Sequence, residues 1–460
     1  MTKNDLFDRL NDEGVSNDAI RSLSDEEYFI LLDALEAQQV DEKGRRLKEQ
    51  VSLANTKNLS SVNIYNAFID AARAKKQTKL SSDEAAEQQN TPVKIGVVTA
   101  SSRDPFEAVD FYLGVFQQPN VEVVWLPLTP ALQQAMFVDN MGGKGCDNLT
   151  RFRAQNNVFD RERLYPARTD MQRKWCEDEA LRIETLSTLD GIFFNGGDQS
   201  KTLAALTTPD GQASAFLTKL HTMWRADKLI VGGTSAGTAV QAGGFMNNRP
   251  VPMLTSGNSK GVLSSGVFAI PPVSQRCEDE NGCANRLVEN AVTIKPTGGF
   301  GLFTIGLLDT HFSERNREVR LIAATAQSSQ QFGFGVDETT ALLVDAFESG
   351  EKVNFSVIGQ GGVYIVDLGQ GRIEESRNGA DGKRAIAGMA HFLPAGSRGS
   401  IDGDMLSVTL LPQSLPEQTA LKRARINVVI VMTVYGEITL CVYAVMVVRP
   451  LGSLMVPYTY

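Results

Sequence analysis

Short apolar runs rich in β-branched residues recur between residues 93 and 237, and each ends in glycine or small polar residues before a segment with helical periodicity. The clearest are VKIGVVTAS, VEVVWLPL, GIFFNGG and KLIVGGTSAG. Near-continuous apolar strands that alternate with helices are typical of parallel strands covered on both faces. The sequence therefore predicts an α/β protein with an open, mostly parallel sheet.

The segment before these runs has a different texture. Residues 1–76 predict a helical N-terminal extension, in which Ser24 and Glu27 have the spacing of a capping box and precede apolar residues at helical intervals. Residues 77–92 are polar and lack apolar periodicity, which indicates a linker.

The α/β domain is expected to span residues 93–368, with insertions at about 135–185 and 260–295. The sequence VNFSVIGQGGVYIVDL, residues 353–368, resembles a hairpin that turns between Gly359 and Gly362. Residues 369–460 are expected to form a β-rich C-terminal extension of unknown role.

Within that extension, residues 427–448 are apolar and long enough to cross a bilayer as a helix. Glu437 lies at the centre beside Gly436, and the β-branched content favours two strands joined at this point. The alternative interpretations are a membrane anchor and a tail without defined structure.

Charge and targeting signals narrow the class of partner and the compartment. The chain has 45 basic and 54 acidic residues, so its net charge of -9 argues against nucleic acid as a partner. The first residues contain no apolar stretch of the kind found in signal peptides, which predicts a cytoplasmic protein.

Five cysteines are too few for a disulfide scaffold, and we expect reduced, buried thiols. The alternative is that Cys146 with Cys176, and Cys277 with Cys283, each close a local loop, which would favour an exported protein. The metal-site spacings are absent and the chain has three histidines, so no metal is expected.

The strongest motif is Gly233-Thr-Ser235-Ala-Gly237, which follows a predicted strand and opens a helical segment. This is the context of a nucleophile elbow, in which a sharp turn presents a serine hydroxyl at the carboxyl end of a sheet. The N–H group of Ala236 is then a candidate oxyanion donor. A glycine-rich turn that only packs, or that binds phosphate, is the alternative.

A serine nucleophile needs a base and an acid that orients it. His311 lies where a predicted strand gives way to a helix, whereas His221 falls within a predicted helix and His391 precedes a loop without an acidic neighbour. We therefore predict His311 as the base. Asp337 and Glu338 are both candidates for the acid, and the residues alone do not separate them from each other or from a solvated turn.

Two further groups of residues are candidates for substrate binding. Arg315, Arg317 and Arg320 follow His311 and could recognise a carboxylate, although such runs also occur as solvated faces balanced by glutamates. In FFNGGDQSKTL the backbone at Gly197 could supply a second oxyanion donor, and Asp198 or Gln199 could contact the substrate, unless the segment is a plain turn.

Taken together, FFNGGDQSKTL, GGTSAGTAV, LLDTHFSERNREVRL and GFGVDETTALLV resemble, in this order, the cyanophycinases, which are serine-type hydrolases of peptidase family S51. The resemblance implies a three-layer α/β sandwich of the class I glutamine-amidotransferase-like (flavodoxin-like) type. It also implies hydrolysis of cyanophycin, a polyaspartate with arginine on each β-carboxyl group, to β-Asp-Arg dipeptides through an acyl-enzyme.

Carried over by resemblance, Ser235 is the nucleophile, His311 the base and Glu338 the orienting acid. The positions similar to the substrate pocket of the family are Gln199, Asp309, Arg315, Arg317 and Arg320. Thr310 stands where members often carry glutamine.

The resemblance implies no cofactor, an Asp/Arg polymer or dipeptide as substrate, and leaves a homodimer open. The alternatives are an aspartyl dipeptidase that acts on short Asp-X peptides and a non-catalytic binding module on the same fold.

Overall fold

The computed structural model describes residues 3–79, 91–273, 283, 287–345, 352–375, 384–409, 426–432 and 443–446. The chain folds as two compact units, Met1–Lys57 with Ala67–Gly237, and Asn58–Asn66 with Thr238–Tyr460. Most of the linker 77–92, together with Cys277, Glu437 and Cys441, lies outside the described residues.

The first unit contains a parallel four-stranded sheet in the order β2-β1-β3-β4. Its strands are β1 (Val93–Val98), β2 (Val121–Leu126), β3 (Gly191–Phe194) and β4 (Ile230–Gly233). The two central strands, β1 and β3, are almost entirely buried, as expected from their continuous apolar sequences. The chain is thus a mixed α/β protein with a parallel sheet, which confirms that part of the sequence-based prediction.

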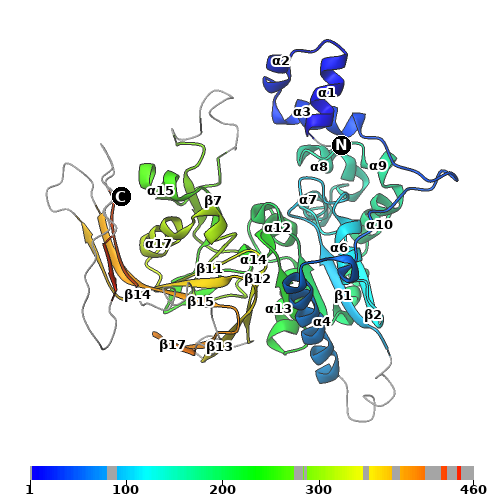
Figure 1. Ribbon diagram of the computed structural model, residues 1–460. Helices are drawn as coiled ribbons and strands as arrows, with labels where there is room; N and C mark the ends of the chain where they lie inside the picture. Colours follow the sequence, from blue (N-terminus) through cyan, green and yellow to red (C-terminus); the bar gives the residue numbers. More distant parts are fainter. Residues whose placement is uncertain are drawn as a thin grey trace. The chain divides into compact units, whose positions relative to one another are not determined.

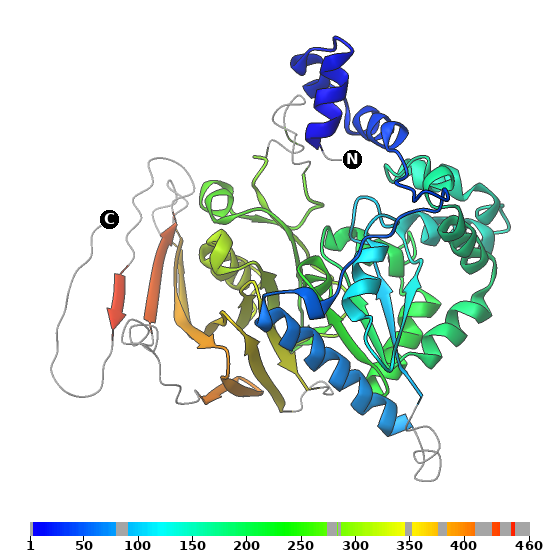
Figure 2. The same ribbon diagram turned by 45° about the vertical axis from the view of Figure 1, so that its right-hand side comes forward.

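Helices lie on both sides of these strands (Figure 2). They are α6 (Val109–Phe116), α7 (Pro130–Asn140), η2 (Cys146–Asn148), α8 (Leu149–Gln155), α9 (Arg161–Leu164), α10 (Pro166–Glu177), α11 (Glu179–Thr188), α12 (Gln199–Leu206) and α13 (Ala215–Arg225). In the predicted insertion 135–185, Cys146 of η2 and Cys176 of α10 form a disulfide. The preference for reduced thiols is therefore wrong for this pair, because the helical fold brings together two cysteines that are 30 residues apart.

The N-terminal extension contains α1 (Lys3–Asp12), α2 (Asn17–Arg21), α3 (Asp25–Leu35), η1 (Leu53–Asn55) and α4 (Leu59–Lys79). The predicted capping box is confirmed, since the Ser24 side chain accepts from the Glu27 N–H and the Glu27 carboxylate accepts from the Ser24 N–H. Phe68 of α4 packs against Phe116 and Phe193, with ring centroids 5.6 and 5.4 Å away. The second half of α4 thus belongs to the core around the sheet.

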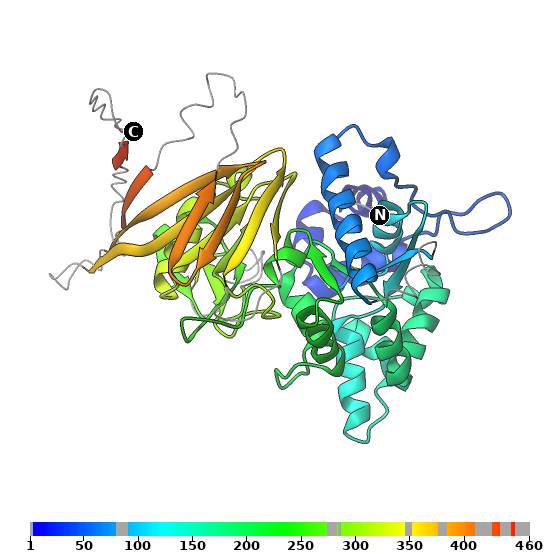
Figure 3. The same cartoon turned by 90° about the horizontal axis from the view of Figure 1, so that it is seen from below.

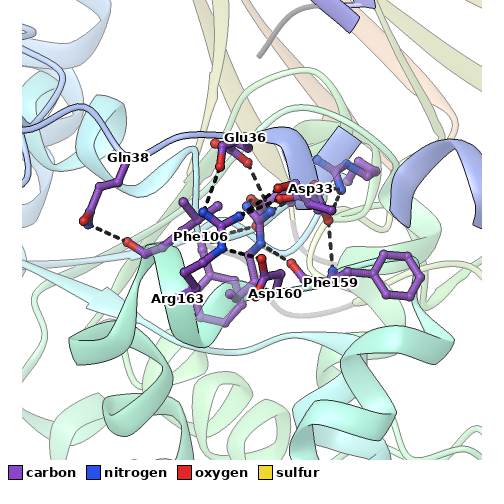
Figure 4. Close-up of polar contacts among 12 residues, drawn as sticks. Asp33, Glu36, Gln38, Phe106, Phe159, Asp160 and Arg163 are labelled. Carbon is purple, nitrogen blue, oxygen red and sulfur yellow. Dashed lines mark hydrogen bonds and ion pairs between the residues drawn. The ribbon is translucent and has the colours of Figure 1, made fainter. Parts of the chain in front are cut away.

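The carboxyl-terminal end of α3 contacts the rest of the first unit through charged groups (Figure 4). Asp33 is fully buried, and both of its carboxylate oxygens lie 2.8 Å from Nη1 of Arg103. Nη2 of Arg161 lies 3.0 Å from Oδ1 of Asp33 and 3.1 Å from Oε2 of Glu36. Arg163 donates to the carbonyl oxygens of Asp33 and Glu36 at 3.0 and 2.9 Å. This buried network ties the extension to the loop that follows β1 and to α9.

The second unit is richer in strands (Figure 1). A six-stranded sheet has the order β10-β11-β14-β15-β18-β19, in which β10 and β11 are parallel and the other neighbours are antiparallel. Its strands are β10 (Leu307–Thr310), β11 (Phe332–Val336), β14 (Gly362–Glu375), β15 (Arg384–Pro394), β18 (Ile426–Met432) and β19 (Tyr443–Met446). Figure 3 shows β14 and β15 as a long, curved pair.

A second sheet of this unit has the order β12-β13-β16-β17, with β12 (Thr340–Val344), β13 (Val353–Gly359), β16 (Arg398–Asp402) and β17 (Met405–Thr409). The remaining elements are α14 (Ala236–Ala239), β5 (Phe245–Met246), β6 (Arg249–Pro250), β7 (Met253–Ser256), α15 (Ser259–Ser265), β8 (Val267–Phe268), β9 (Val292–Lys295), η4 (Ser313–Arg315) and α17 (Glu318–Gln327).

The expected hairpin at 353–368 is wrong, because β13 and β14 join different sheets. Gly359 has φ +116°, and Gly362 donates its N–H to the Asp337 carboxylate, so the turn sends the chain from one sheet to the other.

None of the described helices is both long enough and apolar enough to span a bilayer.

Candidate active site

Ser235 lies directly after β4, at the turn into α14, with φ +52°. This left-handed conformation is rare for a residue with a side chain and is typical of a strained nucleophile elbow. The two flanking positions have no room for a side chain, so both must be glycine. A Cβ on Gly233 would lie 2.2 Å from the Gly237 carbonyl oxygen, and one on Gly237 would lie 2.2 Å from the carbonyl oxygen of Phe194.

The turn after β3 lies against this elbow. A Cβ added to Gly196 would come within 3.3 Å of the Ser235 Cβ, so the backbone of the turn passes beside the serine. Gly197 has φ +143°, and a Cβ there would lie 2.2 Å from the Ser101 carbonyl oxygen. The two turns that carry the predicted oxyanion donors, Gly197 and Ala236, are therefore neighbours in the first unit.

A polar network that we did not predict fixes the turn after β3. Asn195 is buried, and its carboxamide oxygen accepts from Ser101 Oγ at 2.6 Å and from the Ser101 N–H at 3.2 Å. Its amide nitrogen donates to Ser102 Oγ at 2.8 Å. An asparagine at the end of the apolar run GIFF was the available signal, because a buried carboxamide needs partners.

Asp198 and Gln199 follow the same turn. The Asp198 carboxylate accepts from the Ser200 N–H at 2.8 Å and caps α12, while its own N–H donates to the Ser101 carbonyl oxygen at 2.8 Å. Gln199 is the first residue of α12 and is partly exposed. Asp198 thus has a structural role in the turn, and its predicted contact with substrate stays a prediction.

His311 follows β10 and faces Glu338, as the sequence interpretation requires of a base and its orienting acid. Nδ1 of His311 lies 2.8 Å from Oε1 of Glu338. The side chains are 25% and 50% exposed, so the pair is open to solvent on one side. Because a carboxylate can only accept, this contact favours the tautomer with the proton on Nδ1, in which Nε2 is the acceptor of the ring.

The surroundings of the Asp337 carboxylate differ from those of the Glu338 carboxylate. The Asp337 carboxylate is buried and accepts from the N–H groups of Ser313 and Gly362, each at 3.0 Å. It anchors the segment after His311 to the start of β14. Its neighbour Glu338, and not Asp337, holds the imidazole.

The other two histidines lie elsewhere. His221 is within α13, with its ring at 6.5 Å from the Trp224 ring, and His391 lies in β15 opposite Ile365 of β14. Ser235 belongs to the first unit, and His311 with Glu338 to the second.

Two of the three predicted substrate-binding arginines, Arg317 and Arg320, form ion pairs with Asp309, which is 2% exposed. Nε of Arg320 lies 2.9 Å from Oδ2 of Asp309, and the Arg320 Nη1 donates to the Gly257 carbonyl oxygen. Nη1 of Arg317 lies 3.0 Å from Oδ1 of Asp309 and 2.6 Å from the Thr310 carbonyl oxygen. Burial, and then the charge of Arg320, lower the pKa of Arg317 to about 10. Arg315 is exposed on η4.

One group of potential metal ligands occurs among the described residues, formed by Asp139, Cys146 and Cys176. The two sulfurs are joined in the disulfide, so this group offers no thiolate to a metal.

Comparison with known proteins finds no matching family model. The chain is 32% identical over 193 residues to the cyanophycinase of Synechococcus elongatus. The aligned residues make up 42% of this chain and 46% of that protein. It is 29% identical over 202 residues to the cyanophycinase of Trichormus variabilis, covering 43% and 51%. The chain thus matches about half the length of these curated relatives.

A solved structure described as a peptidase from an acI-B1 Actinobacterium is also similar, with 16% identity and a TM-score of 0.37 over 77% of this chain and 94% of that one. The sequence similarity, rather than this low structural score, relates the chain to cyanophycinases.

Proposed function

We propose that this protein is a serine-type peptidase of the cyanophycinase kind, with Ser235 as nucleophile, His311 as general base and Glu338 as the acid that orients it. The proposal rests on the presence in one chain of two features, each built within its own unit. These are a serine in a left-handed elbow (φ +52°) and a histidine whose Nδ1 lies 2.8 Å from a carboxylate. The fold we propose for the catalytic domain is the class I glutamine-amidotransferase-like sandwich of peptidase family S51.

In this mechanism, Nε2 of His311 takes the proton from Ser235 as Oγ attacks the amide carbonyl carbon. The N–H groups of Gly197 and Ala236 stabilise the oxyanion. His311 then gives the proton to the leaving amine, which leaves an acyl group on Ser235. A water molecule attacks the carbonyl carbon of this acyl group as His311 takes its proton. His311 returns the proton to Ser235 Oγ as the acid product leaves. The substrate is cyanophycin, and the product is the β-Asp-Arg dipeptide.

Three substrates test the proposal: cyanophycin granules, β-linked Asp-Arg and α-linked Asp-Arg, with released products identified by mass spectrometry. We expect dipeptide release from the polymer, abolished in Ser235→Ala and unchanged in Ser187→Ala, an exposed serine on α11. Cleavage of only the α-linked dipeptide would indicate an aspartyl dipeptidase. Inactivity on all three would favour a non-catalytic binding module, and activity in Ser235→Ala would refute the assignment of the nucleophile.

A further inference from the structure

A small cavity opens in the first unit at the start of α12, the helix that follows the turn carrying Gly197. The space inside it that admits a water-sized group is about 20 Å³, and the wider empty volume of about 300 Å³ includes open solvent at its mouth. The lining residues come from the loop after β1, the start of α7 after β2, and the first turn of α12 after β3. The cavity therefore lies at the carboxyl ends of parallel strands, where open α/β sheets bind their ligands.

The charged residues that line the cavity are all cationic: Arg103, Arg153 and Lys201. Two of these side chains already form an ion pair with a carboxylate. Arg103 is held by Asp33 of α3 with both distances at 2.8 Å, and Arg153 is paired with Glu162. Both guanidinium groups are thus fixed in place before any ligand arrives.

Lys201 differs from the two arginines. Within the described part of the chain its ammonium group has no ion pair within 4 Å, although Asp198 lies near enough to favour its charge. Burial, and secondly the charge of Arg103, lower the pKa of Lys201. Because Asp198 already caps α12, an anion that entered the cavity would supply the close partner that Lys201 lacks.

The position of Lys201 connects this cavity to the candidate nucleophile. Lys201 lies in the first turn of α12, which begins directly after the Gly196–Gly197 turn, and that turn passes beside Ser235. Ser102, which also lines the cavity, accepts from Asn195 and retains a hydroxyl proton that it can donate.

We propose that Lys201, with the cavity that it lines, is a subsite for a carboxylate group of the substrate. The inference rests on the proposed function and deepens it. An arginine joined through its α-amino group to a β-carboxyl group keeps its own carboxylate, so the branched substrate carries such a group in every repeat. Lys201 binds this carboxylate, and the Ser102 hydroxyl donates to it.

Binding is measured first, without turnover, by calorimetric titration of the Ser235→Ala protein with succinate, succinamide and inorganic phosphate. We expect succinate to bind and neutral succinamide not to bind. Lys201→Met should weaken succinate binding by about tenfold or more, whereas Lys201→Arg stays within about threefold. Lys174→Met, an exposed lysine on α10, is the matched control and should bind succinate as the parent does.

The steady-state kinetics of hydrolysis are measured next, in protein that retains Ser235. On the branched substrate, Lys201→Met should raise KM about tenfold or more with kcat within about twofold, because the lost contact serves binding rather than the chemical step. The melting temperature of each variant checks its fold, and Lys201→Gln replaces Lys201→Met if the latter does not fold.

The outcomes are distinguishable from failure of the proposed function. Succinate binding that depends on Lys201 supports the subsite even if no tested substrate is cleaved. Binding of phosphate without succinate, binding of succinate that is unchanged in Lys201→Met, or binding of neither anion would overturn it. An unchanged KM in an active Lys201→Met enzyme would also overturn it.

Discussion

Asp337 and Glu338 are neighbours in the chain but belong to different hydrogen-bond networks. Asp337 accepts from two backbone N–H groups in a buried position, whereas Glu338 is half exposed and faces His311. Charge-assisted bonds to buried amides stabilise the fold, and a carboxylate beside an imidazole orients a base. The two residues should therefore separate in their effects on stability and on catalysis.

Glu338→Gln is expected to lower kcat by about 100-fold or more with little change in unfolding free energy, because an amide no longer favours the correct imidazole tautomer. Asp337→Ala should instead cost about 2–3 kcal/mol of stability by leaving two amides unsatisfied. Dipeptide release and urea unfolding of both variants measure the two effects. Equal loss of stability in both variants would contradict this division of roles.

The glycines of the elbow give a second prediction at this scale. Gly237→Ala places a Cβ 2.2 Å from the carbonyl oxygen of Phe194, so the elbow must move, and we expect loss of activity with a cost of about 2 kcal/mol or more. The control is Gly211→Ala, where φ is +85° but nothing lies within 4 Å, with an expected cost of about 1 kcal/mol. Thermal unfolding and activity should rank the two variants in this order.

At the scale of elements, the end of α3 is held by a carboxylate that is completely buried. Asp33 contacts Arg103 and Arg161 and accepts from the Phe159 N–H at 2.9 Å (Figure 4). Removal of one partner from a buried network is costly because the other charges remain buried. These charged contacts therefore dock the carboxyl-terminal end of α3 on the rest of the first unit.

Asp33→Asn should weaken this docking by about 3 kcal/mol or more and increase hydrogen exchange and protease cleavage across α1 to α3. Glu26→Gln, at an exposed position of the same helix, is the control and should leave both unchanged. If hydrogen exchange across α1 to α3 is the same in the two variants, the network around Asp33 does not hold these helices in place.

At the scale of the whole molecule, the chain is divided into two compact units with their own buried apolar residues. Large proteins of this kind depart from a single two-state transition. The proposed catalytic residues are distributed over both units, so the proposed mechanism requires both units to be folded. The disulfide Cys146–Cys176 lies within the first unit.

Calorimetry should accordingly resolve two unfolding transitions. Replacing Cys146 and Cys176 by serine removes a cross-link between residues 30 positions apart and should lower the stability of the first unit by about 3–4 kcal/mol. The transition of the second unit should stay where it is. A reductant added to the parent protein should reproduce the shift, and an equal shift of both transitions would show that the units unfold together.

The sequence alone was sufficient for features that depend on neighbouring residues. The parallel strands follow from continuous apolar runs, the capping box from the spacing of Ser24 and Glu27, and the elbow from glycines on both sides of Ser235. In each case the constraint acts within a few residues, so the pattern in the chain carries it directly.

Only the tertiary structure decided features that join distant segments. It placed Glu338 against His311, enclosed Asp309 between Arg317 and Arg320, and directed β13 and β14 into different sheets. It also joined Cys146 to Cys176. These pairings depend on how the elements fold against one another, and a local pattern does not distinguish between two acids or two registers that are equally compatible with it.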